Sequence, residues 1–263
     1  KIICRYGRRR EEEADMSLSI ETNYKNLSSG YKINRAADDA AGLAIAEKLE
    51  NQSNMYDAAT QNAKIGNDML NVADGALGNL HDVLSRIREI GVKASNSALY
   101  SKHELSMMQN EINELKKGIS DIAKNTQFNG LKLLDGSMAD MNLATNPTGK
   151  GQEIKMVNTS LEALGIADFD VTKDFDIRDI DKALKKVNSA RSNIGAQSNR
   201  LAYTVMSNQY TSYNLTAANS LIRDTNMAEE MSDLQKNTIL EQLRINMQKK
   251  QMEQEEKRNS FFI

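Results

Sequence analysis

The chain has 263 residues, of which 40% are hydrophobic and 27% are charged, and its formal net charge is -2 at pH 7. This length and apolar content allow a buried core in one or two domains and exclude disorder throughout. The near balance of charge leaves no global field that would draw the protein to nucleic acid or to an anionic membrane. No apolar run approaches the roughly 20 residues that span a bilayer, and no apolar stretch typical of a cleaved signal peptide follows the basic start.

The rarity of helix breakers favours long helices. Pro147 is the only proline, tryptophan is absent, and aromatic residues make up 5% of the chain. A proline inside a helix costs about 3 kcal/mol, so helices can run uninterrupted on either side of residue 147. The single cysteine, Cys4, cannot form an internal disulfide, and His81 and His103 have no nucleophile at a catalytic spacing. No enzyme activity, cofactor or metal site is expected.

The first strong helical period lies between residues 65 and 94. Apolar residues there step by threes and fours, which predicts a packed helix from near Ala40 to near Asn96. We expect two seams joined by a stutter between Ala76 and Leu80. The predicted seam residues are Ile65, Met69, Val72, Ala76, Leu80, Val83, Ile87, Ile90 and Ala94.

A shorter helix follows, and after it the period is lost. Ser101 and Glu104 form a capping-box pattern that predicts the start of this helix, which should end before Asn125. Its apolar seam is Leu105, Met108, Ile112, Leu115, Ile119 and Ile122. Between 125 and 175, turn residues interrupt the chain, and residues 141–145 and 152–157 are predicted to pair as a hairpin.

A third helix carries a heptad pattern from Ile180 to Ile222 that is apolar except at Asn208. Asn208 is either a buried polar residue that fixes the register or an exposed residue on a slightly rotated face. The heptad positions are Ile180, Val187, Ile194, Leu201, Asn208, Leu215 and Ile222, with Leu184 and Val205 in the second seam.

The lengths of these helices predict a mainly α fold. The first and third helices are each some 50 residues long and can lie antiparallel over their full length. We therefore expect an elongated antiparallel helical bundle, or coiled-coil rod, of two long helices and one shorter helix. A small β-hairpin element, within about residues 137–175, should lie at one end of the rod.

The segment LSSGYKINRAADDAAGL, residues 27–43, is predicted to connect a terminal helix to the first long helix. Gly30 and Gly42 can adopt the dihedral angles of such a joint. Asp38 and Asp39 lie where a helix begins and should accept its free backbone N–H groups. A metal site at this pair is disfavoured, because no further ligand lies nearby.

This segment resembles the signature of the bacterial flagellin family. The resemblance continues through LAIAEKL (43–49), LSRIREIGVKASN (84–96), NEINELKKGI (110–119), NTQFNGLKLLDG (125–136), IDKALKKVNSARSNIGAQSNRL (180–201) and YNLTAANSLIRDTNMAEEM (213–231). It covers about residues 17–240, in a short form without the large variable central domains. It implies an extracellular structural subunit of the bacterial flagellum, exported without a cleaved signal peptide, that associates with copies of itself and with an export chaperone.

The resemblance also implies a division into segments. Residues 17–42 would be the N-terminal part of the terminal domain and its linker, with Leu27, Gly30, Asn34, Asp38, Asp39 and Gly42 forming the linker motif. Residues 43–223 would form the helical rod, and residues 224–263 the C-terminal helix with an atypical end. Residues 1–16 contain a basic run followed by an acidic one, which predicts a solvated or disordered tail. The atypical C-terminal stretch is 248–258.

By the same resemblance, one face of the rod would bind the vertebrate Toll-like receptor that senses flagellin. The matching positions are Arg86, Ile90 and Glu111, where a guanidinium would stand beside an apolar anchor. In the alternative interpretation, Arg86, Arg88 and Glu89 form a solvated face or contact neighbouring subunits, and Ile90 is buried in the seam.

Three functions follow from these patterns. The first is a filament subunit that associates in an open helical array. The second is a flagellin-like rod that does not polymerise and binds a chaperone or an innate immune receptor. The third is a hook-filament junction protein, which shares the plan of long helices.

Overall fold

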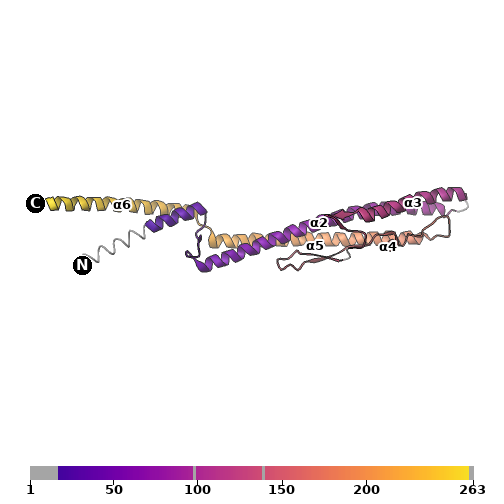
Figure 1. The fold of residues 1–263 in the computed structure, drawn as a ribbon, viewed down its shortest axis with the longest axis horizontal. Coiled ribbons are helices and arrows are strands. Elements are labelled where there is room, and N and C mark those ends of the chain that lie inside the picture. Colours follow the sequence, from indigo (N-terminus) through magenta and orange to yellow (C-terminus); the bar gives the residue numbers. More distant parts are fainter. Residues whose placement is uncertain (1–16, 97–98, 138–139, 261–263) are drawn as a thin grey trace. The chain divides into compact units, whose positions relative to one another are not determined.

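The computed structural model describes residues 17–96, 99–137 and 140–260, and the chain divides into two compact units (Figure 1). Unit 1 combines Lys1–Asn51 with Asn214–Ile263, and unit 2 is Gln52–Tyr213. A helix over residues 17–29 comes first. The named elements are α2 (Ala40–Ala94), α3 (Lys102–Asn125), β1 (Gln127–Phe128), β2 (Leu131–Lys132), β3 (Asp140–Leu143), β4 (Gln152–Lys155), α4 (Leu161–Leu164), α5 (Ile177–Arg223) and α6 (Met227–Ser260). The predicted tail 1–16 lies outside the described residues.

Unit 2 is a bundle of α2, α3 and α5 around one apolar core, as the sequence predicts. Its seam on α2 differs from the predicted one, because Ile65 and Val72 are 53% and 42% exposed. The buried side runs without a stutter at steps of four and three, through Ala59, Ala63, Gly66, Leu70, Ala73, Leu77, Leu80, Leu84, Ile87, Gly91 and Ala94. Alanine and glycine fill many of these positions, which lets the neighbouring elements approach closely.

The predicted start of α3 is confirmed. The Ser101 side chain accepts from the backbone N–H of Glu104, and the Glu104 carboxylate accepts from the backbone N–H of Ser101 at 2.7 Å. Ile112 and Ile119 are fully buried. The other predicted seam residues, Leu105, Met108, Leu115 and Ile122, are half-buried against the core. The capping box thus sets the register at which α3 packs its apolar face.

The predicted hairpin is present as β3 and β4, which pair antiparallel with Leu143 opposite Gln152. We expected it at one end of the bundle, but its contacts lie on the sides of the long helices. Asn62 of α2 donates to the Ala144 carbonyl at 3.1 Å, and a Cβ on Gly66 would collide with the Leu143 side chain. The gap left by glycine in the helix explains why the strands pack there.

A second strand pair, β1 and β2, was not predicted. Its turn is Asn129-Gly130, with φ values of 50° and 77°, a pair that favours tight hairpin turns. The strands are only two residues long, so no alternating pattern marks them. The turn dipeptide was the one available signal.

The heptad on α5 is confirmed from Ile180 to Asn208, which is buried, whereas Leu215 and Ile222 are only half-buried. The Asn208 amide Nδ2 donates to the Thr145 carbonyl at 3.0 Å, so the buried amide holds the hairpin turn against the helix. Ile180, Val187 and Leu201 are almost fully buried, and Leu184 and Val205 pack against the same core. Alanines at 183 and 190 complete the buried face.

Unit 1 pairs the helix over residues 17–29 with α6. Asn237 Nδ2 donates to Ser19 Oγ at 3.1 Å, and Asn26 Nδ2 donates to Glu230 Oε1 at 3.2 Å. Leu234 is the apolar side chain of α6 that is buried, at 8% exposure. The pairing therefore relies on amide groups as well as on apolar burial. None of the helices in the described residues combines the length and apolar character that crossing a membrane requires.

Candidate functional site

Two joints of the chain lie beside each other in unit 1. Residues 30–39 connect the first helix to α2, and residues 224–226 connect α5 to α6. The Lys32 N–H donates to the Arg223 carbonyl at 2.8 Å, and the Thr225 N–H donates to the Gly30 carbonyl at 2.9 Å. With the antiparallel bridge between Tyr31 and Asp224, these bonds clip one joint to the other. Backbone groups that loops would leave to water are thereby satisfied.

Arg223 and Lys32 reinforce the clip at the end of α5. The Arg223 guanidinium lies 4.4 Å above the Tyr31 ring centroid and donates to Glu50 Oε2 at 3.1 Å. Lys32 Nζ donates to the Leu221 carbonyl at 3.1 Å. Cations at a helix C-terminus satisfy its free carbonyls and oppose its dipole. Sequence reasoning did not single out Tyr31, Lys32 or Arg223, although a basic residue closing a long helix was a usable signal.

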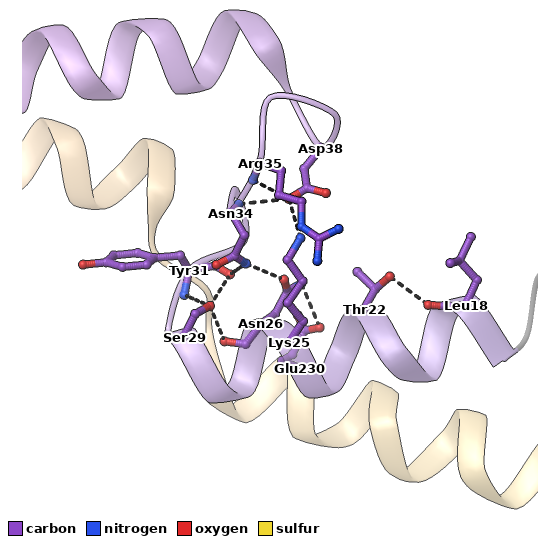
Figure 2. A network of polar contacts seen from close by, with 10 residues as sticks. All are labelled: Leu18, Thr22, Lys25, Asn26, Ser29, Tyr31, Asn34, Arg35, Asp38 and Glu230. Carbon is purple, nitrogen blue, oxygen red and sulfur yellow. Dashed lines mark hydrogen bonds and ion pairs between the residues drawn. The ribbon is translucent and has the colours of Figure 1, made fainter.

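Asp38 organises the first joint, but not in the predicted way. Its Oδ2 accepts from the backbone N–H groups of Asn34 and Arg35 at 3.0 and 2.9 Å and from Lys25 Nζ at 2.9 Å (Figure 2). The Lys25 bond, followed by the two backbone bonds, lowers the pKa of Asp38 to about 2. Asp38 therefore closes the turn before α2 instead of capping the helix. The Asp38 side chain points to backbone N–H groups that precede it in the chain. A spacing rule for helix starts considers only the N–H groups that follow, so it could not predict this.

Asn34 connects the same turn to the first helix. Its Nδ2 donates to the Tyr31 carbonyl at 2.8 Å and to Asn26 Oδ1 at 3.2 Å (Figure 2). Asn26 in turn donates to Glu230 of α6, as described above. A continuous polar network therefore runs from the first joint into the paired terminal helices. Leu27 lies half-buried beside it.

Asp39 is the residue that caps α2. Its Oδ1 accepts from the Gly42 N–H at 2.9 Å, as predicted for a helix start. Gly30 has φ of 75°, which confirms the dihedral role expected of it. Gly42 is needed for a different reason: a Cβ there would meet the Asp39 carboxylate and lie 2.8 Å from Ile33 Cδ1. The described residues contain no group of three or more His, Cys, Asp or Glu able to hold a metal ion.

The second predicted site lies on unit 2. Arg86 donates to Glu111 Oε1 through Nε and Nη2, at 3.0 and 2.8 Å, and to Glu89 Oε2 at 3.1 Å. Hydrogen bonds to Glu111 and then to Glu89 raise the pKa of the Arg86 guanidinium. Arg88 lies apart from this group and donates to Asp181 Oδ1 at 2.7 Å. Arg86, Glu89 and Glu111 thus form one exposed charged network across α2 and α3.

Ile90 does not belong to that exposed network. It is 3% exposed and packs in the core, as the alternative interpretation held. The seam period places it on the inner side of α2, so the predicted apolar anchor beside Arg86 is absent from the surface. Arg86 and its carboxylate partners are therefore the part of this site that a binding protein could reach.

The comparisons with known proteins match most of the chain. A model of the bacterial flagellin N-terminal helical region matches residues 10–139, and a model of the C-terminal helical region matches residues 177–255. The chain belongs to the bacterial flagellin family. It is 37% identical to a flagellin of Bacillus subtilis, covering 84% of this chain and 86% of that protein. It is 36% identical to the flagellar filament 33 kDa core protein of Treponema phagedenis, covering 86% of each.

The fold agrees with a solved flagellin. The crystal structure of Bacillus cereus flagellin matches with a TM-score of 0.50 and 25% identity, over 56% of this chain and 88% of that one. The matched regions extend beyond the resemblance that the sequence motifs covered, into residues 10–16 and 241–255. As a flagellin, this chain is a structural subunit of the bacterial flagellar filament, and its family consists of structural proteins.

Proposed function

We propose that this flagellin contacts its filament neighbours through the exposed apolar face of unit 1. Leu240, Leu243 and Met247 follow one another on α6 at steps of three and four and are 43%, 56% and 63% exposed. Leu18 and Tyr24 on the first helix are 60% and 59% exposed. A helix that leaves such a stripe in water gains free energy by covering it. This stripe is the single observation that carries the proposal.

The hydrogen bonds at the two joints would hold that face in a fixed position. Asn26, Asn34 and Asp38 join the first helix, its joint and α6 in one network, and the Gly30–Thr225 bond fixes the second joint to the first. Both terminal segments then leave the clip in a fixed register. We assign residues 17–42 and 224–263 to this terminal domain and residues 43–223 to the filament wall, with the linker motif connecting the two along the chain.

Seeded polymerisation followed by electron microscopy tests this proposal. Leu240→Gln with Leu243→Gln should raise the protein concentration needed for filament growth, because it removes the centre of the stripe. The control pair is Leu99→Gln with Met107→Gln, which alters two residues of unit 2 that are 74% and 60% exposed. Equal growth of the stripe variant and the wild type, at equal helix content, would contradict the proposal.

A second function, recognition by the flagellin-sensing Toll-like receptor, is supported by the Arg86 network. Its three side chains are between 46% and 62% exposed, and the guanidinium is held in place by two carboxylates. A pre-organised arginine loses little side-chain entropy on binding a partner. Arg86→Ala should weaken receptor binding, whereas Arg178→Ala, at a position that is 83% exposed, should not. Equal affinities of the two variants would remove the assignment.

The apolar face of α6 also suits an export chaperone, which would cover it before the subunit reaches the extracellular filament. Leu240, Leu243 and Met247 would then be shared between the chaperone and the neighbouring subunit, one after the other. A chaperone that binds the Leu240→Gln, Leu243→Gln variant as tightly as the wild type would contradict this. A hook-filament junction protein is disfavoured by the two flagellin matches.

A further inference from the structure

The tip of the hairpin formed by β1 and β2 is the turn Asn129-Gly130, the only Asn-Gly dipeptide in the sequence. Both residues have a positive φ, 50° and 77°, which is the pattern of a type I′ turn. Both are exposed, and no described atom lies within 4 Å of the position that a Cβ on Gly130 would occupy. The dipeptide therefore has room to change its conformation.

The backbone nitrogen of Gly130 is available as a nucleophile. Its N–H donates to no backbone carbonyl within the described residues, because β1 and β2 pair through Phe128 and Leu131 on either side of the turn. In a helix the same N–H would be bound to the carbonyl four residues earlier. Glycine also has no side chain to hinder the approach of its nitrogen to the side-chain carbonyl of Asn129.

The φ of Asn129 already suits closure of a ring between these two groups. Turn types I′ and II′ share a φ of about 60° at their first central residue and differ in the peptide plane that follows it. Turning this plane over moves the Gly130 nitrogen to the side where the Asn129 side chain lies. The motion reverses the sign of φ at Gly130, and glycine adopts both signs readily. Both turn types close two-residue hairpins, so the strands can stay paired.

We propose that Asn129 is a site of spontaneous deamidation. The Gly130 nitrogen loses its proton to hydroxide and attacks the side-chain carbonyl carbon of Asn129. The side-chain nitrogen takes a proton from water and leaves as ammonia, which gives a five-membered succinimide ring. Water then adds to one of the two ring carbonyls and opens the ring. Attack at the side-chain carbonyl leaves aspartate, and attack at the main-chain carbonyl leaves isoaspartate.

Either product changes the tip of the hairpin. The new carboxylate adds one negative charge to a chain whose formal net charge is -2. Isoaspartate also carries the main chain through its Cβ, which lengthens the turn by one atom. The base of the hairpin is anchored, because the Leu133 N–H donates to the Thr126 carbonyl at 3.2 Å and Leu133 and Leu134 are buried. The disturbance should therefore stay within residues 127–132, and it does not depend on filament assembly.

Peptide mapping of the aged full chain tests the site. After incubation at mildly alkaline pH, mass spectrometry should find deamidation at Asn129 at a rate within about tenfold of that in the free peptide of residues 125–132. Isoaspartate should exceed aspartate, because direct hydrolysis of the side-chain amide gives aspartate only. A rate more than about a hundredfold below that of the peptide, or aspartate as the sole product, would overturn the proposal.

Asn188 on α5 provides the matched control. It is exposed and is followed by the small residue Ser189, but both lie in the interior of a long helix. Ser189→Gly gives Asn188 the same following residue as Asn129, without the turn. At unchanged helix content, deamidation at Asn188 in this variant should be at least about tenfold slower than at Asn129 in the same chain, because the helix must first open. Equal rates would overturn the role assigned to the turn.

The pH dependence supplies a readout that does not depend on the control. Ring closure needs the deprotonated nitrogen of Gly130, so the rate at Asn129 should rise about tenfold per pH unit from neutral to mildly alkaline pH. A rate that does not change with pH would contradict attack by this nitrogen.

Discussion

Unit 1 and unit 2 are each stabilised internally by a different kind of interaction. Unit 2 contains nearly all the buried apolar side chains of the described residues, and unit 1 contributes only Ile33, Ala46 and Leu234 to them. Unit 1 depends instead on hydrogen bonds among amides, carboxylates and backbone groups at its two joints. Hydrogen bonds add little net stability in water, whereas apolar burial drives folding. Unit 2 should therefore fold alone, while unit 1 acquires much of its stability from neighbours.

Truncating a buried side chain in the core of unit 2 should have the largest effect on the free energy of unfolding. Leu77 is fully buried in the α2 seam, so Leu77→Ala should lower the free energy of unfolding by about 2–5 kcal/mol. Ile65→Ala is the control, since Ile65 is half-exposed outside the corrected seam, and it should cost less than about 1 kcal/mol. Urea titration followed by circular dichroism measures both. Similar losses in the two variants would contradict the corrected seam.

The next effect should come from filling the space at the start of α2. Gly42→Ala places a methyl group against Asp39 and Ile33, which displaces the capping carboxylate. Loss of a cap costs about 1–2 kcal/mol. The damage should stay in unit 1, so amide exchange should speed up at the start of α2 and not in α3. Gly75→Ala is the control, because a Cβ there meets nothing within 4 Å.

A smaller effect is expected at the cap of α3. Ser101→Ala removes the side chain that accepts from Glu104 N–H and should destabilise the chain by about 1 kcal/mol. This change tests whether a polar cap adds to the stability of unit 2, which otherwise comes from apolar burial. A thermal transition unchanged from that of the wild type would show that packing alone fixes α3.

The smallest global effect, with the clearest pH dependence, is expected at Asp38. Its pKa is lowered from 3.8 to about 2, so its contribution is present above pH 3.8 and is lost as the pH falls through about 2. Asp38→Asn should speed exchange of the Asn34 and Arg35 amides at pH 6, and the difference from the wild type should shrink as the pH falls through about 2. Asp39→Asn is the control, since asparagine also caps helices. A difference independent of pH would mean that charge plays no part.

The sequence predicted the helices better than it predicted their contacts. Helix bounds came from periodicity and from caps such as Ser101, which act locally. The α2 seam was misplaced at Ile65 and Val72 because large apolar residues were counted, whereas Gly66 and Ala73 occupy the buried positions. Small residues are chosen where neighbours approach closely, and a hydrophobicity pattern cannot detect that.

Prediction of the candidate site was limited for a similar reason. Asp39 follows a local capping rule and was placed correctly, whereas Asp38 binds Lys25, thirteen residues away, and closes a loop. The clip between Gly30 and Thr225 joins parts of the chain that no local pattern connects. For Ile90 the local period was the better guide, because the seam predicted a buried residue and only the family resemblance placed it on the surface. Long-range hydrogen bonds and exposure were the missing information.

Hydrogen exchange in the monomer and in the filament tests the central claim most directly. Amides of residues 17–29 and of α6 should exchange fast in the monomer and become protected in the filament. Amides around Leu77, Ile112 and Ile119 should be protected in both states. Strong protection of α6 in the monomer, or none gained on polymerisation, would contradict the account of unit 1 as the part that neighbours stabilise.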